Sequence, residues 1–240
     1  MLSFLEDLEA RSVAVGLTLY IGAGQSRKYV TGLGGEYHQV RQWLVQLAST
    51  LARSATGSVV FWSEGGGHVV IPPFPVEDDG LLEGWDASRL RALLSREYLL
   101  GVVLVRLGRY AVGVLEGEVL VASKTDSRYV KGKHSAGGQS QKRFARIREK
   151  QAHELFKKTC TVVREQFAPY EGRLDYVLLG GERHTLKGLV DVCDCLQRLS
   201  PRTLGRVLNV REPKLEALKR VSETVWESRV LSMPSVEPSQ

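Results

Sequence analysis

The segment KGKHSAGGQSQKRFARIREK, from Lys131 to Lys150, joins a strand-rich part of the sequence to a long helical part. Between Ser127 and Arg148 the sequence contains seven Lys or Arg residues and neither Asp nor Glu. The first residues of the segment contain no large apolar side chain, which predicts a loop. Because clustered Lys and Arg attract polyanions, this acid-free segment predicts a contact with RNA.

The positive charge of the chain is concentrated around the same segment. The 240 residues carry a net charge of +6. From Lys124 to Lys158, eleven Lys or Arg residues stand against three acids, a balance of +8, so the remaining residues sum to −2. A local excess of this kind is typical of a nucleic-acid contact rather than of a diffusely charged surface.

Residues Ser140–Phe167 predict one long amphipathic helix. At 100° per residue, five basic residues fall within an arc of about 60°. These residues, called the basic face below, are Arg143, Arg146, Lys150, Lys157 and Arg164. The broad apolar face holds Phe144, Ala152, Leu155, Phe156, Val162, Val163 and Phe167. A solvated charged face is the ordinary alternative, but the single sign of this face favours a contact with RNA.

The residues on both sides of this helix predict a mixed sheet. Three alternating stretches predict strands at Leu99–Leu107, Tyr110–Leu115 and Glu118–Ser123, with Gly108 and Gly117 in the turns between them. After the helix, the pattern predicts a strand at Leu174–Leu179, a helix at Thr185–Leu196, a strand at Arg202–Val210 and a helix at Pro213–Val230. The order βββαβαβα indicates an α/β domain whose sheet is covered by helices.

The first 96 residues predict a smaller α/β domain. Its expected elements are helices at Ser3–Ala10, Tyr37–Ser54 and Ala87–Ser95, a strand at Val13–Ile21, and a hairpin of Ser58–Trp62 with His68–Ile71. We therefore predict an N-terminal domain over residues 1–96, a second domain over 97–232, and a disordered tail over 233–240.

Two Gly-rich turns follow predicted strands. GAGQS, Gly22–Ser26, could cradle a phosphate, but it lacks the P-loop ending and the dinucleotide fingerprint. GGERH, Gly180–His184, lies at a strand end, where α/β proteins often bind ligands. A plain connecting turn is the favoured interpretation at both places.

The cysteines and histidines do not form a metal motif. Cys160, Cys193 and Cys195 lack a second ligand pair at zinc spacing, which predicts small buried thiols in a reducing compartment. The five histidines show no metal-binding spacing either. The N-terminus carries acids among its apolar residues, and no apolar run approaches the ~20 residues of a membrane span. We expect a cytoplasmic protein with no cofactor, no metal and no membrane partner.

The tripeptide Gly137-Gly138-Gln139 is a weak signal by itself, because two glycines before a helix can form an ordinary turn with Ser140 as N-cap. Its context is more specific. HSAGGQS, His134–Ser140, followed by Arg143-Phe144-Ala145-Arg146, closely resembles the catalytic loop of the class-I peptide-chain release factors of eukaryotes and archaea. The three preceding strands and the Leu178–Gly181 turn also resemble the middle domain of that family, and residues 1–95 resemble a shortened N-terminal domain.

The resemblance implies an ester hydrolysis. In that family the Gly-Gly-Gln loop enters the peptidyl transferase centre and releases the nascent chain from tRNA. Gly137 and Gly138 are then expected to permit a close backbone approach. Gln139 is expected to place its backbone N–H near the developing oxyanion and its side chain near the attacking water. This assignment agrees with the lack of a nucleophile elbow or a Cys/His catalytic pattern in the sequence.

Departures from the family pattern narrow the expected role. The sequence has no Asn-Ile-Lys-Ser tetrapeptide, which reads stop codons in that family, and no third domain follows Val230, so no partner GTPase is expected. The chain therefore resembles the VLRF-type peptidyl-tRNA hydrolases of ribosome quality control. We expect a codon-independent peptidyl-tRNA hydrolase acting on stalled ribosomes or large subunits. The alternative is a non-catalytic adaptor that binds the ribosomal tRNA site.

The expected partners are the large ribosomal subunit, through its rRNA, and peptidyl-tRNA. The residues expected to contact RNA are Lys131, Lys133, His134, Ser140, Lys142, Arg143, Arg146, Lys150, Lys157 and Arg164. A nuclease is disfavoured because the predicted sheet presents no cluster of carboxylates for Mg²⁺.

Overall fold

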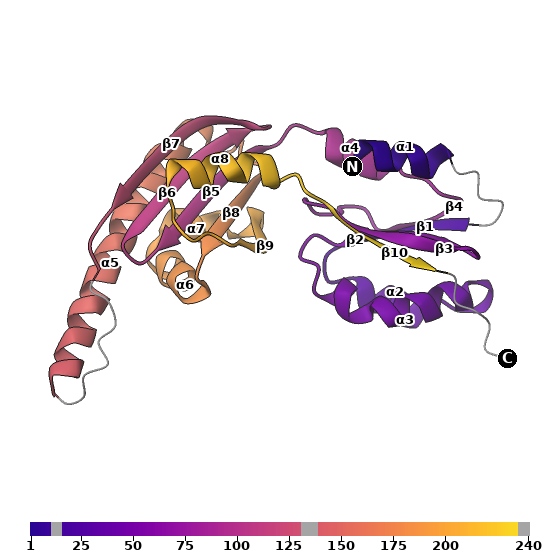
Figure 1. Ribbon diagram of the computed structural model, residues 1–240, viewed down its shortest axis with the longest axis horizontal. Coiled ribbons are helices and arrows are strands. Elements are labelled where there is room, and N and C mark those ends of the chain that lie inside the picture. The colour runs from indigo at the N-terminus through magenta and orange to yellow at the C-terminus, as the bar shows by residue number, and fades with distance from the viewer. Residues whose placement is uncertain (11–15, 131–138, 235–240) are drawn as a thin grey trace. The chain divides into compact units, whose positions relative to one another are not determined.

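The computed structural model describes residues 1–10, 16–130 and 139–234 (Figure 1). The chain divides into two compact units. The first unit combines Met1–Arg96 with Val225–Gln240, and the second unit is Glu97–Thr224. The second unit is therefore inserted into the first along the sequence. No helix in the described part of the chain combines the length and the hydropathy of a membrane span.

The first unit is built on an antiparallel sheet with the strand order β10-β3-β2-β1-β4. Its strands are β1 (Gly16–Ile21), β2 (Ser58–Ser63), β3 (Gly66–Ile71), β4 (Gly80–Glu83) and β10 (Arg229–Pro234). Its helices are α1 (Leu2–Ala10), α2 (Ser26–Gly32), α3 (His38–Ala52) and α4 (Ser88–Ser95), with a 3₁₀ turn at Gly35–Tyr37.

Both faces of this sheet are covered by helices. Leu19 and Val60 face α3, where they pack with the buried Trp43. Tyr20 and Phe61, the next residues along the same strands, face α1 and α4 on the other side. Because successive strand residues point to opposite faces, strands that carry apolar residues on both faces support helices on both sides (Figure 1).

The second unit contains the predicted mixed sheet, with the strand order β7-β6-β5-β8-β9. The strands are β5 (Leu99–Arg106), β6 (Arg109–Glu116), β7 (Val119–Ser127), β8 (Tyr176–Gly181) and β9 (Thr203–Leu208). β5, β6 and β7 form an antiparallel meander, whereas β8 and β9 are added to β5 in parallel. The α/β fold class and the order βββαβαβα are confirmed.

Helices also cover both faces of the second sheet. They are α5 (Gln139–Phe167), α6 (Arg183–Val192), α7 (Asp194–Arg198) and α8 (Leu215–Thr224), with 3₁₀ turns at Ala168–Tyr170 and Ser200–Arg202. The ring of Phe167 in α5 packs directly on Gly101 in β5, where a Cβ atom would lie 2.7 Å from the ring. On the other face, Leu218 of α8 packs in the same way on Gly113 of β6.

Three predictions about the C-terminal part of the chain were wrong. The helix expected at Pro213–Val230 ends at Thr224, and β10 follows and pairs with β3. Residues 225–234 therefore belong with the first unit and not with a domain over 97–232, and β10 also includes two residues of the expected tail. The apolar residues of β10 pack on both faces of the sheet, so the stretch lacks the period of two that marks a half-exposed strand.

Three further differences between the predicted and the observed elements concern the helix at Thr185–Leu196, helix α2 and strand β4. The single helix expected at Thr185–Leu196 is interrupted at Cys193, which has extended backbone angles and links α6 to α7. Helix α2 and strand β4 were not predicted. β4 lies in an acidic stretch with little apolar pattern and is held by its pairing with β1.

Candidate functional site

Helix α5 forms an arm that begins at Gln139. Its 29 residues correspond to a length of about 43 Å. Fully buried side chains begin only at Leu155, and no described side chain from Arg143 to Glu154 is buried. The first half of α5 extends beyond the edge of the second sheet (Figure 1). Gln139, Ser140 and Lys142 lie in the first turn of this arm.

The basic face predicted for α5 is exposed. The side chains of Arg143, Arg146, Lys150 and Lys157 are all exposed, and none of the four forms an ion pair within the described part of the chain. Arg164 differs, because its guanidinium is bonded to Asp194. The structure therefore brings four of the five predicted side chains together as unpaired cations.

The predicted apolar face of α5 is buried toward the sheet. Leu155, Phe156, Val162, Val163 and Phe167 belong to the core of the second unit. Ala152 packs against that core and is half-buried. The remaining predicted site residues, Lys131, Lys133, His134, Gly137 and Gly138, lie outside the described residues.

Two ion pairs join the end of β7 to α5. Arg128 Nη2 donates to Glu154 Oε2 at 2.7 Å. Lys158 forms the second pair with Asp126, and their hydrogen bond lowers the pKa of Asp126 and raises the pKa of Lys158. Neither pair was predicted from the sequence. The signal that could have found them is the presence of only three acids in the basic segment from Lys124 to Lys158.

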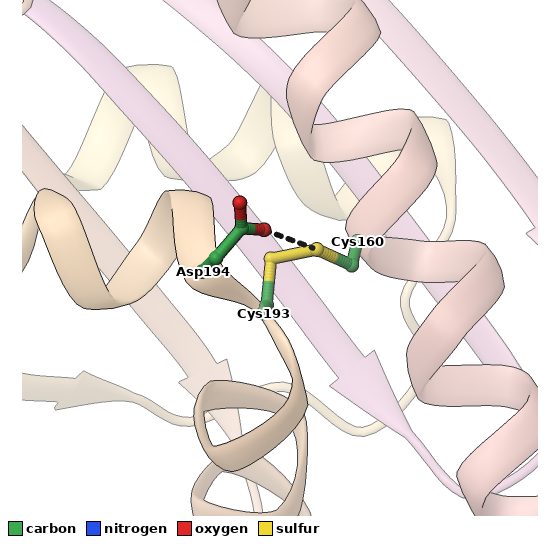
Figure 2. A group of neighbouring side chains, drawn as sticks. All are labelled: Cys160, Cys193 and Asp194. Carbon is green, nitrogen blue, oxygen red and sulfur yellow. Dashed lines mark hydrogen bonds between the residues drawn. A yellow bond between two sulfur atoms is a disulfide. The ribbon is translucent and has the colours of Figure 1, made fainter.

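A disulfide joins the later part of α5 to the break between α6 and α7 (Figure 2). Cys160 and Cys193, 33 residues apart, form this bond, and both are buried. The prediction of thiols was wrong for this pair, because spacing along the chain does not show which cysteines meet in space. Cys195 is a buried free thiol whose pKa is raised by burial.

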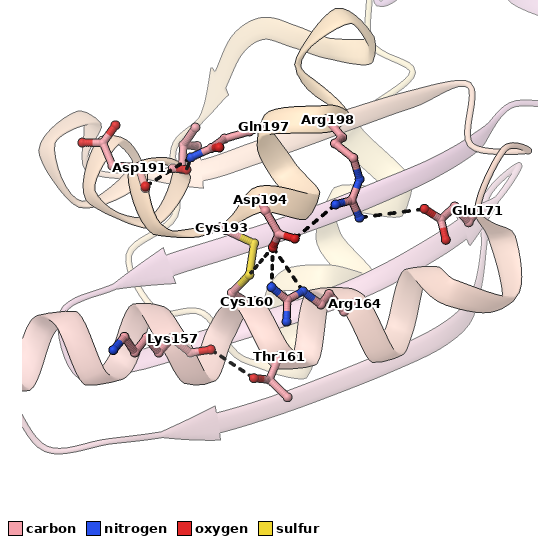
Figure 3. A network of polar contacts seen from close by, with 11 residues as sticks. Lys157, Cys160, Thr161, Arg164, Glu171, Asp191, Cys193, Asp194, Gln197 and Arg198 are labelled. Carbon is pink, nitrogen blue, oxygen red and sulfur yellow. Dashed lines mark hydrogen bonds and ion pairs between the residues drawn. A yellow bond between two sulfur atoms is a disulfide. The ribbon is translucent and has the colours of Figure 1, made fainter.

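Asp194 connects the same two elements through charge (Figure 3). Its carboxylate accepts hydrogen bonds from Arg164 Nε at 3.2 Å and from Arg198 Nη1 at 3.1 Å. The bond from Arg164 lowers the pKa of Asp194 and raises the pKa of Arg164. Arg164 is thereby held in a structural network and is less available to RNA.

Among the described residues, one group of donor atoms is compact enough to hold a metal ion: Cys160, Cys193 and Asp194, whose ligand atoms lie within 4.8 Å of one another. The chemistry of these donors does not fit a metal. Both sulfur atoms are bonded to each other, and the carboxylate is already shared by two guanidinium groups. A cation placed here would need thiolates and would lie beside two positive charges.

The two Gly-rich turns have structural explanations. A Cβ atom at Gly181 would lie 2.0 Å from the Val105 carbonyl oxygen, so this position requires glycine. The following Glu182 pairs with Arg106. In the other turn, the N–H of Gly22 donates to Asp79 Oδ1 at 2.5 Å. A carboxylate of the chain therefore already occupies the turn that could have held a phosphate.

A groove of about 740 Å³ lies between α5 and α6 in the second unit. His153 from α5 and His184 from α6 line it together with Arg148, Glu149 and Asp191. The lining of this groove contains both acids and bases, whereas the basic face of α5 contains only bases.

Comparison with known proteins identifies the family. Residues 98–231, more than half of the chain, match the family model described as "Actinobacteria/chloroflexi VLRF1 release factor". The chain is 37% identical over 102 residues to peptide chain release factor subunit 1 of Methanosphaera stadtmanae, covering 42% of this chain and 25% of that protein. It is 30% identical over 171 residues to the protein of the same name from Methanopyrus kandleri, covering 68% of this chain and 41% of that protein.

The chain thus spans between a quarter and two fifths of the length of these curated relatives. Among solved structures, an archaeal translation termination factor, aRF1, is 19% identical with a TM-score of 0.44, over 93% of this chain and 68% of that chain. A chain described as "Vms1 mitochondrial localization core" is 13% identical with a TM-score of 0.44, over 84% and 87%. From the match over residues 98–231, the chain belongs to the VLRF1 family of release factors, in the class-I release factor superfamily.

Proposed function

We propose that this protein is a codon-independent peptidyl-tRNA hydrolase that acts in the cytoplasm on stalled ribosomes or large subunits during ribosome rescue. The observation that carries the proposal is the arm of α5, which begins at Gln139 and presents Arg143, Arg146, Lys150 and Lys157 as exposed cations that form no ion pair with any described residue. Membership of a release factor family supports a role in translation.

The proposed reaction is the hydrolysis of the ester between a nascent peptide and tRNA. Water attacks the ester carbonyl carbon, the bond to the ribose oxygen breaks, and that oxygen leaves with a proton as a free hydroxyl group. In this proposal Gln139 positions the water and donates its backbone N–H to the developing oxyanion, an interaction of a kind worth about 10²–10³ in rate. Gly137 and Gly138 allow the backbone to approach the ester.

The basic face has a separate task in this proposal. Its cations contact rRNA phosphates and bring the tip of α5 to the peptidyl transferase centre. Arg143, Arg146 and Lys150 lie on the exposed half of α5, which places three charges along about 10 Å of helix. A partner GTPase is not needed for this recognition.

The test is peptide release from stalled large-subunit complexes. Wild type should release the peptide. Gln139→Ala removes the side chain proposed to position the water, and Gly138→Ala adds a Cβ atom where the backbone must approach the ester. Each variant should lower the rate about 100-fold, the cost of misplacing a reacting group by about 1 Å. Gln141→Ala makes the same substitution two residues further along and serves as the control. Undiminished release by Gln139→Ala and Gly138→Ala would contradict the catalytic assignment. Binding of wild type to the complex without any release would instead identify a non-catalytic adaptor.

A further inference from the structure

The basic segment from Lys124 to Lys158 also contains three acids. They are Asp126, Glu149 and Glu154. A surface that binds a polyanion is weakened by every carboxylate it contains. Nevertheless, two of these three acids form ion pairs, and both pairs join the end of β7 to α5.

The two pairs form a ladder. From Asp126 to Arg128 the chain advances two residues, or about 7 Å in an extended strand. Lys158, the partner of Asp126, and Glu154, the partner of Arg128, are four residues apart in α5, or about 6 Å along the helix. The two spacings agree, so both pairs can form at once. The later strand residue pairs with the earlier helix residue, so the strand end runs antiparallel to α5.

Other contacts fix the same strand end. The backbone N–H of Arg128 donates to the carbonyl oxygen of Gly108 at 2.8 Å, in the turn between β5 and β6. Val130 is half-buried and packs against the core of the second unit. Residues 126–130 are therefore attached to the sheet by backbone, to the core by an apolar side chain, and to α5 by charge.

The attachment lies at a defined distance from the predicted catalytic residue. Glu154 is fifteen residues after Gln139 in one continuous helix, which corresponds to about 22 Å. The segment that carries Gly137 and Gly138 is bounded by this attachment on one side and by the start of α5 on the other. Where residues 126–130 are held therefore determines where that segment begins.

We propose that Arg128–Glu154 and Asp126–Lys158 are positioning pairs, which hold the base of the Gly-Gly-Gln segment in register with α5, and that Arg128 and Lys158 are not RNA contacts. This inference rests on the proposed hydrolase function. It assigns the four residues a role in placing the catalytic segment, so they act through Gln139 without touching the substrate.

Removing an acid distinguishes a role in RNA binding from a role in positioning. The loss of a negative charge should tighten binding to RNA, whereas the loss of the ion pair should lower the maximal release rate. Glu154→Gln frees Arg128 and makes the surface more positive. If charge alone mattered, binding to the ribosomal complex would tighten and the maximal release rate would stay the same. If the pair positions the segment, the maximal rate falls about two- to fivefold, the range that exposed ion pairs contribute, while the half-saturating concentration does not rise.

The experiment measures single-turnover peptide release from stalled large subunits at varied protein concentration. Glu154→Gln and Asp126→Asn should both lower the maximal rate, and the charge swap Arg128→Glu with Glu154→Arg should restore it to within about twofold of wild type. Glu149→Gln is the matched control, because it removes the third acid of the segment from an exposed position that forms no ion pair in the described chain. Equal maximal rates for Glu154→Gln and Glu149→Gln would overturn the proposal.

Hydrogen exchange of the backbone amides at 126–130, measured on the same variants, separates this inference from the proposed function. Faster exchange in Glu154→Gln, reversed by the charge swap and absent in Glu149→Gln, supports the anchoring role even before activity is considered. Exchange identical to that of Glu149→Gln overturns it. If wild type releases no peptide, the proposed function fails and catalytic positioning is overturned with it, whereas the exchange result still decides whether the pairs anchor the strand end.

Discussion

At the scale of single residues, Tyr20 shows how a buried polar group is satisfied inside the first unit. Its hydroxyl donates to the carbonyl oxygen of Asp86 at 3.0 Å and accepts from the N–H of Leu90 at 3.1 Å. These bonds connect β1 with the start of α4. Burial, the largest cause, raises the pKa of Tyr20 to about 12.

The raised pKa makes a prediction about alkaline stability. A tyrosine has an unfolded pKa of about 10, so the stabilising contribution of Tyr20 is present below pH 10 and is lost as pH rises toward 12. Tyr20→Phe should lower stability at neutral pH, because Leu90 loses its hydrogen-bond acceptor, and should flatten the decline above pH 10. Urea unfolding between pH 8 and pH 11 measures both effects. Tyr129→Phe is the control, because Tyr129 is 75% exposed. If the free energy of unfolding declined above pH 10 with equal slope in wild type and in Tyr20→Phe, Tyr20 would not be the cause of the decline.

At the scale of elements, α5 performs two tasks along its length. Its first half is exposed and basic, and its second half is fixed by a buried core, by the Cys160–Cys193 bond and by the Arg164–Asp194 pair. The fixed half provides a rigid base from which the exposed half extends.

The basic face should determine how binding depends on salt. Each phosphate contact adds about 0.7–0.9 to the slope of log affinity against log salt. Arg146→Gln combined with Lys150→Gln should therefore lower that slope by about 1.5 in a binding titration with a fluorescent RNA hairpin. Arg164→Gln should lower it much less, because Asp194 already shares that charge. If Arg164→Gln lowered the slope as much as each of the other two substitutions, Arg164 would contact RNA in spite of its ion pair with Asp194.

The disulfide should contribute measurably to the stability of the second unit. In the chain-entropy account, closing a loop of 33 residues stabilises the folded state by roughly 4 kcal/mol. Disulfides are rare in the cytosol, so oxidised and reduced protein should be compared. Thermal unfolding should show a higher midpoint without reductant, and Cys160→Ser should abolish this difference. Cys195→Ser should preserve it, because Cys195 is not part of the bond; loss of the difference in that variant would indicate a different pairing.

At the scale of the whole molecule, the chain crosses between its two units twice, at Arg96 and again before Val225. The strand that returns, β10, completes one edge of the first sheet. Val230 packs toward α1 and α4, and Leu231 packs toward α3. A segment that follows the second unit in sequence therefore stabilises the first.

This topology predicts a selective loss of stability. Leu231→Asp places a charge on a half-buried apolar position of β10 and should destabilise the first unit by about 2 kcal/mol or more, while the second unit is unaffected. Hydrogen exchange resolved by peptide would show faster exchange in β1, β2 and β3 and unchanged exchange in β5 and β6. Arg229→Asp introduces the same residue at an exposed position of the same strand and should have little effect. Faster exchange in both units would contradict their independence.

Much of the second unit could be predicted because its signals are local. The strands around Val103 and Val112 are apolar at nearly every position and are bounded by glycine turns, and α5 combines an apolar stripe with a basic one, so burial is visible in the order of residues. The missed elements lack such a pattern. β4 depends on pairing with β1, and β10 depends on an edge provided by residues more than 150 positions earlier.

The mixed sheet, the basic face of α5 and the resemblance carried by Gly137, Gly138 and Gln139 could all be predicted from the order of the residues. These follow from residue types at short spacings, which decide local conformation and which face is buried. Three contacts are visible only in the folded chain: the bond between Cys160 and Cys193, the pairing of Glu154 with Arg128, and the pairing of β10 with β3 of the first unit. Such contacts join residues that are distant along the chain, and their energy depends on distance in space, which spacing in sequence does not specify.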